Sequence, residues 1–372
     1  MDFGQRAFLN IRRSFGGVQE IGLLAVILLL ALALTVAAEP VTVQGRTVNN
    51  FFRIDNLLPN VATPVSWMAI MAIGATMVII SGGIDISIGS VFGCSALGTV
   101  AALQHLPPDA SPWMVIPLGI GIPLLIGATC GLLNGALVVG LRMHPFIVTL
   151  GSMSILRGIA LIAVETKSLP APGLDMPAAF TANFIAYEIH SGGLEWAKLQ
   201  PVPLLIMLAC GIIGALYLGR TPSGREIYAV GGNEEAARFS GLRVGMIKIR
   251  IYMLAGLSAG MAGMISAGYY GSANTATGEG YELAVIAAAV VGGASLSGGR
   301  GTALGAVLGA LIIKLIENGI DILKEVNFGL FTVHVSKEYS KIIIGTAIIV
   351  AVAIDRLSEY LRAKNHRTRG RQ

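Results

Sequence analysis

Residues 61–81, VATPVSWMAIMAIGATMVIIS, form an apolar run without a single charged side chain. A helix of about 20 apolar residues is long enough to cross the hydrocarbon core of a bilayer. The run therefore predicts a transmembrane helix. Backbone polar groups in lipid must be paired within the protein, so repeated runs of this kind predict a helical bundle.

Similar runs recur along the whole chain. They give about ten candidate spans, at residues 21–38, 61–81, 84–103, 113–140, 145–166, 202–219, 250–270, 281–296, 302–320 and 340–355. The eighth run is short, and the fourth is long enough to tilt or to break at Pro117 or Pro123. Only 13% of the 372 residues are charged, against about 25% in a soluble domain. The predicted fold class is an all-α, polytopic transmembrane bundle.

Positive charge predicts the orientation of the bundle. With ten spans, most of the 26 Lys and Arg fall on the side of the N-terminus, which predicts that both chain ends are cytoplasmic. Residues 1–20 then form a cytoplasmic N-terminus, 21–355 the membrane domain, and 356–372 a basic cytoplasmic tail. Within the domain, residues 220–249 form a cytoplasmic loop and 167–201 a long outer loop. The net charge of +5 is explained by topology, so it gives no reason to expect nucleic-acid binding, although the tail could contact anionic lipid.

The first run could instead belong to a signal peptide, since Val36, Ala37 and Ala38 resemble a cleavage site. The apolar core of a signal peptide is usually about 7–15 residues long. Residues 21–38 exceed this length, which favours a retained first span.

The polar stretch GREIYAVGGNEEAARFSGL, residues 224–242, predicts a short helix in the cytoplasmic loop. Asn233 is a good N-cap, Glu234 and Glu235 suit a helix N-terminus, and Gly241 suits a helix end. Isolated helices shorter than about 12 residues are marginal in water. The helix therefore needs a packing partner, either another protein or this chain's own spans.

Glycines recur at every fourth position in two of the predicted spans. Such spacing leaves one helix face without side chains and allows close helix crossing. The predicted packing glycines are Gly127, Gly131 and Gly135 in the fourth span, and Gly301, Gly305 and Gly309 in the ninth. Two further stretches, GGIDISIGS at 82–90 and GGASLSGGR at 292–300, match in Gly and Ser positions. Both fall on the cytoplasmic side, so they are not equivalent points of an inverted repeat; duplication and chance both explain the match.

Catalytic motifs are absent from the sequence. There is no G-x-x-x-x-G-K-[ST], H-E-x-x-H or G-x-S-x-G pattern, which predicts that the chain neither hydrolyses ATP nor acts as an enzyme. The three cysteines, Cys94, Cys130 and Cys210, lie in apolar runs without metal-ligand spacing. No metal or bound cofactor is therefore predicted for this chain.

Three polar residues within the spans are candidates for a translocation pathway or gate: Asp85, Asn134 and Arg157. Each has a structural alternative: Asp85 as a helix cap, Asn134 as a partner of a backbone carbonyl, and Arg157 in an ion pair. Lys314 and Glu317 are three residues apart and are predicted to pair on one helix face. So few acidic groups argue against a proton or sodium relay and for an external energy source.

Four stretches of the chain resemble the membrane permeases of ribose-type bacterial sugar ABC transporters. They are SGGIDISIGSV (81–91), NGALVVGLRMHPFIVTLGSMSILRGIAL (134–161), TPSGREIYAVGGNEEAARFSGLRVGMIKIRIYMLAGLSAGMAG (221–263) and AVVGGASLSGGRGTALGAVLGALI (289–312). Their order and spacing match the family as well, and the resemblance covers roughly residues 55–355. The first 50 residues and the 167–201 loop are less typical.

The resemblance implies a permease of the type II ABC importer kind in the bacterial inner membrane. It implies three protein partners: a second permease copy or paralogue, a periplasmic or lipid-anchored sugar-binding protein, and a cytoplasmic ABC ATPase that uses ATP. It also implies that the short polar helix is the coupling helix that the ATPase receives. The residues assigned to coupling are Gly232, Asn233, Glu234, Glu235, Ala236, Ala237, Arg238, Phe239 and Gly241.

Two alternatives to a sugar permease remain open at the level of sequence. The first is an ABC permease for branched-chain amino acids or nucleosides. The second is a carrier or channel that works without an ATPase. The identity of the sugar and the choice between homodimer and heterodimer are not predicted.

Overall fold

The computed structural model describes residues 18–43, 45–190, 198–323, 325–327, 332–334, 336 and 338–369. Residues 1–17 of the predicted cytoplasmic N-terminus, 191–197 of the predicted outer loop and 370–372 of the predicted tail lie outside the described residues.

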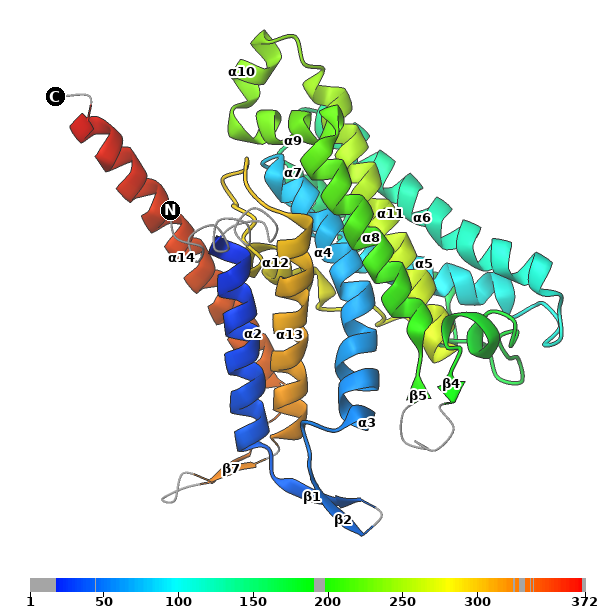
Figure 1. Cartoon of the computed structure of the whole chain (residues 1–372). Helices are drawn as coiled ribbons and strands as arrows, with labels where there is room; N and C mark the ends of the chain where they lie inside the picture. The colour runs from blue at the N-terminus through cyan, green and yellow to red at the C-terminus, as the bar shows by residue number, and fades with distance from the viewer. Residues whose placement is uncertain are drawn as a thin grey trace.

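The chain folds into a helical bundle, which confirms the predicted fold class (Figure 1). Within the described ranges, seven helices are long and apolar enough to cross a membrane. Each predicted span corresponds to a helix. These are α2 (Val18–Ala37), α4 (Thr63–Ile80), α5 (Ile88–Leu103), α6 (Pro112–Gly140), α7 (Pro145–Ala163), α8 (Pro201–Arg220), α11 (Val244–Tyr270), α12 (Tyr281–Val291), α13 (Ala303–Ile322) and α14 (Glu338–Arg369).

Several helix boundaries differ from the prediction. Helix α14 continues to Arg369, through most of the predicted tail at 356–372, and α11 begins at Val244, six residues before the predicted span. The second span begins earlier, because α3 (Ile54–Asn56) and the π-helical turn η1 (Leu57–Ala62) lead directly into α4. The helix α6 continues through Pro117 and Pro123 and does not break. The helix α12 ends at Val291, five residues before the end of the predicted span, and Gly293 beyond it has a φ of +98° that L-residues avoid.

Short elements cover both ends of the bundle. At one end lie α9 (Pro222–Gly232) and α10 (Glu234–Phe239); we call it the α10 end (Figure 1). The opposite end carries the strand pairs β1 (Pro40–Val43) with β2 (Arg46–Asn49), β4 (Ile189–His190) with β5 (Lys198–Leu199), and β7 (Glu325–Asn327) with β8 (Thr332–His334); we call it the hairpin end. The loops predicted to be cytoplasmic and outer are thus separated in space.

One strand pair joins segments that are distant in sequence. Strand β3 (Ser168–Leu169), which follows α7, pairs antiparallel with β6 (Ala273–Asn274), which follows α11. The long loop after β3 also contains the π-helical turn η2 (Thr181–Ile185), which packs against α11. The predicted outer loop is therefore attached to the end of α11.

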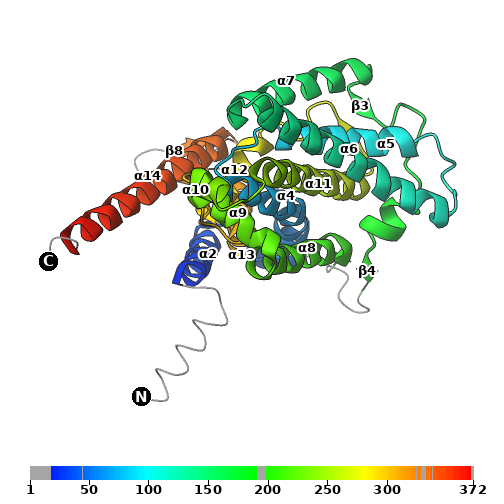
Figure 2. The ribbon, with the colours of Figure 1, turned by 90° about the horizontal axis from the view of Figure 1, so that it is seen from above.

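Helix α4 is the centre of the bundle. All of its residues from Thr63 to Ile80 are buried, including Trp67. It contacts α8, α11, α12 and α13, which surround it when the molecule is viewed from the α10 end (Figure 2). A helix that is apolar on every side is expected in such a position.

Glycines allow the backbones of α6 and α11 to touch. A Cβ placed on Gly127 or Gly131 would collide with the carbonyl oxygen of Gly256 or Tyr252 on α11, and one on Gly135 would lie 2.8 Å from the Cα of Ile249. Without a hydrophobic force between helices in lipid, such close approach is a main source of association.

The second glycine series is divided between a helix and a loop. Gly305 and Gly309 of α13 lie against the backbone of Gly292 and Ala288. Gly301 does not belong to the helix: it precedes the N-cap Thr302 and has a φ of +150°. Gly301 packs instead from the loop against α4, where an added Cβ would lie 3.0 Å from a side-chain carbon of Ile80. A loop glycine and a helix glycine look alike in sequence.

Replacing Gly131 with Ala should lower the thermal unfolding temperature, because the added Cβ meets the backbone of α11. Overpacking of this kind costs about 1–3 kcal/mol. Gly121→Ala is the matched control, because Gly121 lies in the same helix with nothing within 4 Å of an added Cβ. Thermal unfolding of the purified proteins in detergent measures both effects, and equal midpoints would contradict the proposed backbone contact.

Candidate functional site

The short helix α10 has the ends that its sequence predicts. The side chain of Asn233 accepts a hydrogen bond from the backbone N–H of Ala236 at 2.9 Å, so Asn233 is confirmed as the N-cap. The helix ends at Phe239, and Gly241 follows with a φ of +84°. Six residues alone are too few for a stable helix, so packing must hold it in place.

One face of α10 packs against its own chain. Ala237 is buried, and the carboxylate of Glu234 accepts a hydrogen bond from Lys248 of α11 at 2.7 Å. Arg238 also reaches Glu234, at 3.3 Å along the helix. The other face carries Glu235 and Phe239, and Phe239 is 83% exposed. A large apolar side chain on a charged, exposed face indicates a contact surface.

The neighbouring helix α9 anchors α10 to the bundle. Arg250 of α11 donates hydrogen bonds to Ser223 at 3.0 Å and to Glu226 at 2.8 Å. The hydroxyl of Tyr228 donates to the carbonyl of Gly301 at 2.7 Å. Burial raises the pKa of Tyr228, so the hydroxyl keeps its proton and remains a donor.

The sequence does not predict the ion pairs that hold α9 and α10. Lys248 and Arg250 are 14 and 24 residues from their partners Glu234 and Glu226. Helical spacing relates only residues three or four positions apart. No local signal therefore marked these pairs.

Two of the three candidate pathway residues belong to one buried hydrogen-bonded chain. The carboxylate of Asp85 accepts from the N–H of Ser87 at 2.9 Å and from its hydroxyl at 2.6 Å. Asn134 donates to the Ser87 hydroxyl at 2.8 Å and accepts from Ser152 at 2.6 Å. The chain links the loop before α5 to α6 and α7. Sequence reasoning did not find Ser87 and Ser152, because serine is common in membrane helices.

The third candidate, Arg157, lies elsewhere. Its Nη1 donates to the carbonyl of Thr277 at 3.0 Å, and its Nη2 is 4.0 Å from a carboxylate oxygen of Glu282 at the start of α12. Arg157 therefore connects α7 to the segment between α11 and α12. The predicted local pair of Lys314 with Glu317 is confirmed in α13.

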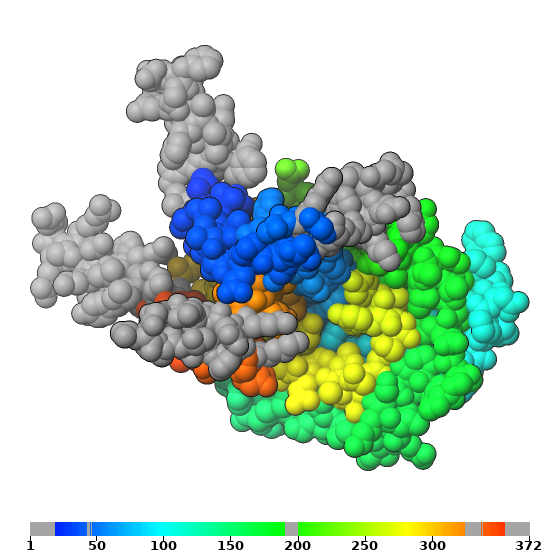
Figure 3. Space-filling view, turned by 90° about the horizontal axis from the view of Figure 1, so that it is seen from below, coloured from blue at the N-terminus to red at the C-terminus, as the bar shows by residue number. Residues whose placement is uncertain are grey.

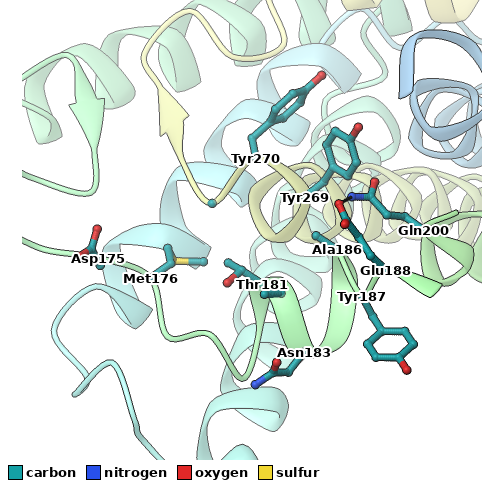
Figure 4. Close-up of a pocket in the computed structure, with 12 residues that line it drawn as sticks. Asp175, Met176, Thr181, Asn183, Ala186, Tyr187, Glu188, Gln200, Tyr269 and Tyr270 are labelled. Carbon is teal, nitrogen blue, oxygen red and sulfur yellow. Dashed lines mark hydrogen bonds between the residues drawn. The ribbon is translucent and has the colours of Figure 1, made fainter. Parts of the chain in front are cut away.

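The hairpin end contains an open pocket of about 860 Å³ between the long loop after α7 and the end of α11. Figure 4 shows the carboxylates of Asp175 and Glu188 and the rings of Tyr269 and Tyr270 around it. Gln200 donates to Glu188 at 3.2 Å. Such groups suit hydrogen bonding to polar molecules at the surface.

The glycine-packed spans and the buried hydrogen bonds between them are features of a multi-pass membrane protein. The family described as "branched-chain amino acid transport system / permease component" matches residues 57–352, and the chain belongs to this family. The protein is thus a transport subunit of the bacterial inner membrane.

Three relatives illustrate the similarity. The ribose import permease protein RbsC of Escherichia coli K12 is 36% identical over 82% of this chain and 87% of its own length. The galactose/methyl galactoside import permease protein MglC of the same strain is 35% identical over 95% and 98% of the two chains. The D-allose transport system permease protein AlsC is 31% identical over 85% and 88%. No solved structure matches the chain.

Replacing Ser152 with Ala should destabilise the protein, because it leaves the buried Asn134 carbonyl without its donor. An unsatisfied buried acceptor costs about 1–3 kcal/mol. Ser154→Ala is the matched control two residues further along α7, where the hydroxyl bonds only to its own helix. Its effect should stay within about 0.5 kcal/mol. Unfolding temperatures in detergent compare the two variants. A smaller decrease in unfolding temperature for Ser152→Ala than for Ser154→Ala would refute the stabilising role of the hydrogen bonds between Ser87, Asn134 and Ser152.

Proposed function

We propose that this chain is the membrane-spanning subunit of an ATP-driven ABC importer that carries a pentose or hexose. The similarity to three permeases whose names specify ribose, galactose and allose supports a sugar as cargo. The observation that carries the ATP-driven mechanism is α10, which presents Phe239 beside Glu235 and Arg238 at the end of the bundle.

The proposed partner at this surface is a cytoplasmic ATPase subunit. The chain has no phosphate-binding loop of its own, so ATP would be bound and hydrolysed by the partner. In this proposal the α10 end and both chain termini are cytoplasmic. Ion pairs from α11 to α9 and α10 would carry movement of the docked helix into the bundle.

The hairpin end would then face outward and receive sugar from a periplasmic or lipid-anchored binding protein. A second permease copy or a paralogue completes the proposed assembly. Lipid covers the remaining apolar surface.

The comparisons support two other functions less strongly than sugar import. The family description includes branched-chain amino acids, whereas the relatives above are named for sugars. In a carrier that works without an ATPase, the exposed face of α10 would have no binding partner. Uptake of labelled sugars by cells tests all three: we expect uptake only with the ATPase and the binding protein present. Uptake that survives loss of the ATPase would exclude an ABC mechanism.

Phe239→Ala should weaken binding of the ATPase subunit roughly thirty-fold, because truncation of a central aromatic anchor costs about 2 kcal/mol. Glu235→Lys should also weaken it, since Glu235 is exposed and pairs with no described residue. Affinity of the detergent-purified permease for the ATPase measures both effects.

Leu141→Ala is the control for these variants, because Leu141 is an exposed apolar residue in another loop of the α10 end. Glu234 is a less informative position, since its replacement also removes the pair with Lys248. If Phe239→Ala binds the ATPase as well as the unaltered protein does, α10 is not the docking surface.

A further inference from the structure

We propose that residues 272–280, SANTATGEG, line the outer half of a water-filled path through the membrane, where Ser272, Asn274 and Glu279 contact the hydroxyl groups of the passing sugar. The inference rests on the proposed function for the nature of the cargo. The position of the segment rests on its own geometry. We call residues 272–280 the path segment.

The path segment descends from the end of α11 into the thickness of the bundle. Gly278 packs against the backbone of Gly89, near the start of α5. Gly89 lies 14 residues before the last residue of α5, Leu103, which corresponds to about 21 Å of helix. The hydrocarbon core is about 30 Å thick, so Gly278 lies well below the outer surface.

Contacts of Tyr281, the residue after the path segment, with α4 and α13 show the depth at which the segment ends. The indole N–H of Trp67 donates to the hydroxyl of Tyr281 at 3.2 Å, and Trp67 lies about 20 Å of helix from the inner end of α4. The ammonium group of Lys314 lies 5.2 Å from the centre of the Tyr281 ring. Lys314 is about 12 Å of helix from the outer end of α13. Tyr281 is thus near mid-membrane.

The path segment is not helical, although it lies at membrane depth. Only its residues Ala273 and Asn274 are in a strand; residues 275–280 are turn, and Ser272 is irregular. Non-helical backbone at this depth is stable only where protein buries it or where it lines a water-filled cavity. Ser272, Asn274, Ala276 and Glu279 are exposed, so the chain itself does not bury that face.

The charge of Glu279 excludes lipid as the neighbour of this face. A charged side chain facing the bilayer centre costs at least about 2.5 kcal/mol. No residue in the described part of the chain pairs with the Glu279 carboxylate. Water and polar cargo satisfy that carboxylate without this penalty.

The opposite face of the path segment is held firmly by the protein. Arg157 donates to the carbonyl of Thr277, and the N–H of Thr275 donates to the carbonyl of Lys167 at 3.0 Å. Asn274 accepts from the N–H of Ala276 at 3.0 Å. Arg157 is therefore a positioning residue: it holds the path segment from the side opposite to its exposed groups.

In the view from the hairpin end, the yellow residues around the end of α11 form part of the open surface (Figure 3).

The exposed groups define the chemistry of the ligand. A hydroxyl, an amide and a carboxylate offer hydrogen-bond donors and acceptors without a positive charge. A neutral polyhydroxyl compound matches this set, whereas an anion would be repelled by Glu279. Burying the path segment would also leave the Glu279 carboxylate without a partner in the described part of the chain.

Cysteine labelling in the complete importer tests the inference. In a background with Cys94, Cys130 and Cys210 replaced by Ala, we expect Ser272→Cys, Asn274→Cys and Glu279→Cys to react with a membrane-impermeant cationic methanethiosulfonate. Leu125→Cys and Ile213→Cys are controls on the exposed apolar surface of α6 and α8 and should remain unreactive. Failure of all three path variants to react in an importer that still takes up sugar would overturn the inference and leave the proposed function intact.

Blockage of uptake distinguishes a path from an ordinary exposed surface. Labelling of Glu279→Cys should abolish the uptake that this variant retains before labelling, and transported sugar should slow the labelling. Glu165→Cys is the matched control, because Glu165 is an exposed glutamate just beyond α7; its labelling should leave uptake unchanged. If labelling changes the uptake of neither variant, the path is refuted.

Substitution of Glu279 provides an independent readout. Glu279→Leu should reduce sugar uptake roughly ten-fold, because it removes the hydrogen bonds of a charged acceptor, whereas Glu279→Gln should retain most of it. Surface expression is measured in parallel, so that a folding defect is recognised. Unchanged uptake in a normally expressed Glu279→Leu protein would contradict contact with the sugar.

Discussion

The backbone contact between α6 and α11 is the interaction on which the other parts of the structure depend. In lipid the helices gain little from hiding apolar side chains from each other, so close atomic contact must hold them. Gly127, Gly131 and Gly256 provide it, because at these positions the two backbones meet with no side chain between them. Helix α11 is 27 residues long, about 40 Å, and these contacts fix its middle part, from Ile249 to Gly260.

Both functional segments are attached to the ends of α11. At one end α10 precedes it and is held by Lys248; at the other end the path segment, residues 272–280, follows directly. A helix packed this tightly moves as a rigid element, because well-packed interiors transmit displacement rather than absorb it. The arrangement gives a direct physical route between the surface that binds the ATPase in our proposal and the wall that meets the sugar.

Polar groups inside the bundle fall into two kinds. The first kind satisfy one another by hydrogen bonds and are buried or nearly so: Asp85, Ser87, Asn134 and Ser152. These hydrogen bonds fix the relative positions of α5, α6 and α7. Arg157 differs, because it holds the carbonyl of Thr277 and lies beside Glu282 behind an exposed polar segment. Asp85 and Asn134 thus hold helices together, whereas Arg157 holds the path segment, although all three are polar residues within predicted spans. A role for any of them in the pathway is a proposal.

The sequence by itself determined the helical fold, the approximate position of each span and the caps of α10. These properties depend on local composition: apolar length, the side chain of Asn233 and the glycine after the helix. Tertiary structure decided which residues meet. The pair of Lys248 with Glu234, the chain through Ser87 and Ser152, and the descent of residues 272–280 join segments far apart in sequence. No periodic pattern marks such contacts, because they arise only when packed helices bring distant polar groups to the same depth. In the sequence the path segment resembles an ordinary loop. Its contact with Gly89, and the contacts of the following Tyr281 with Trp67 and Lys314, place it within the membrane.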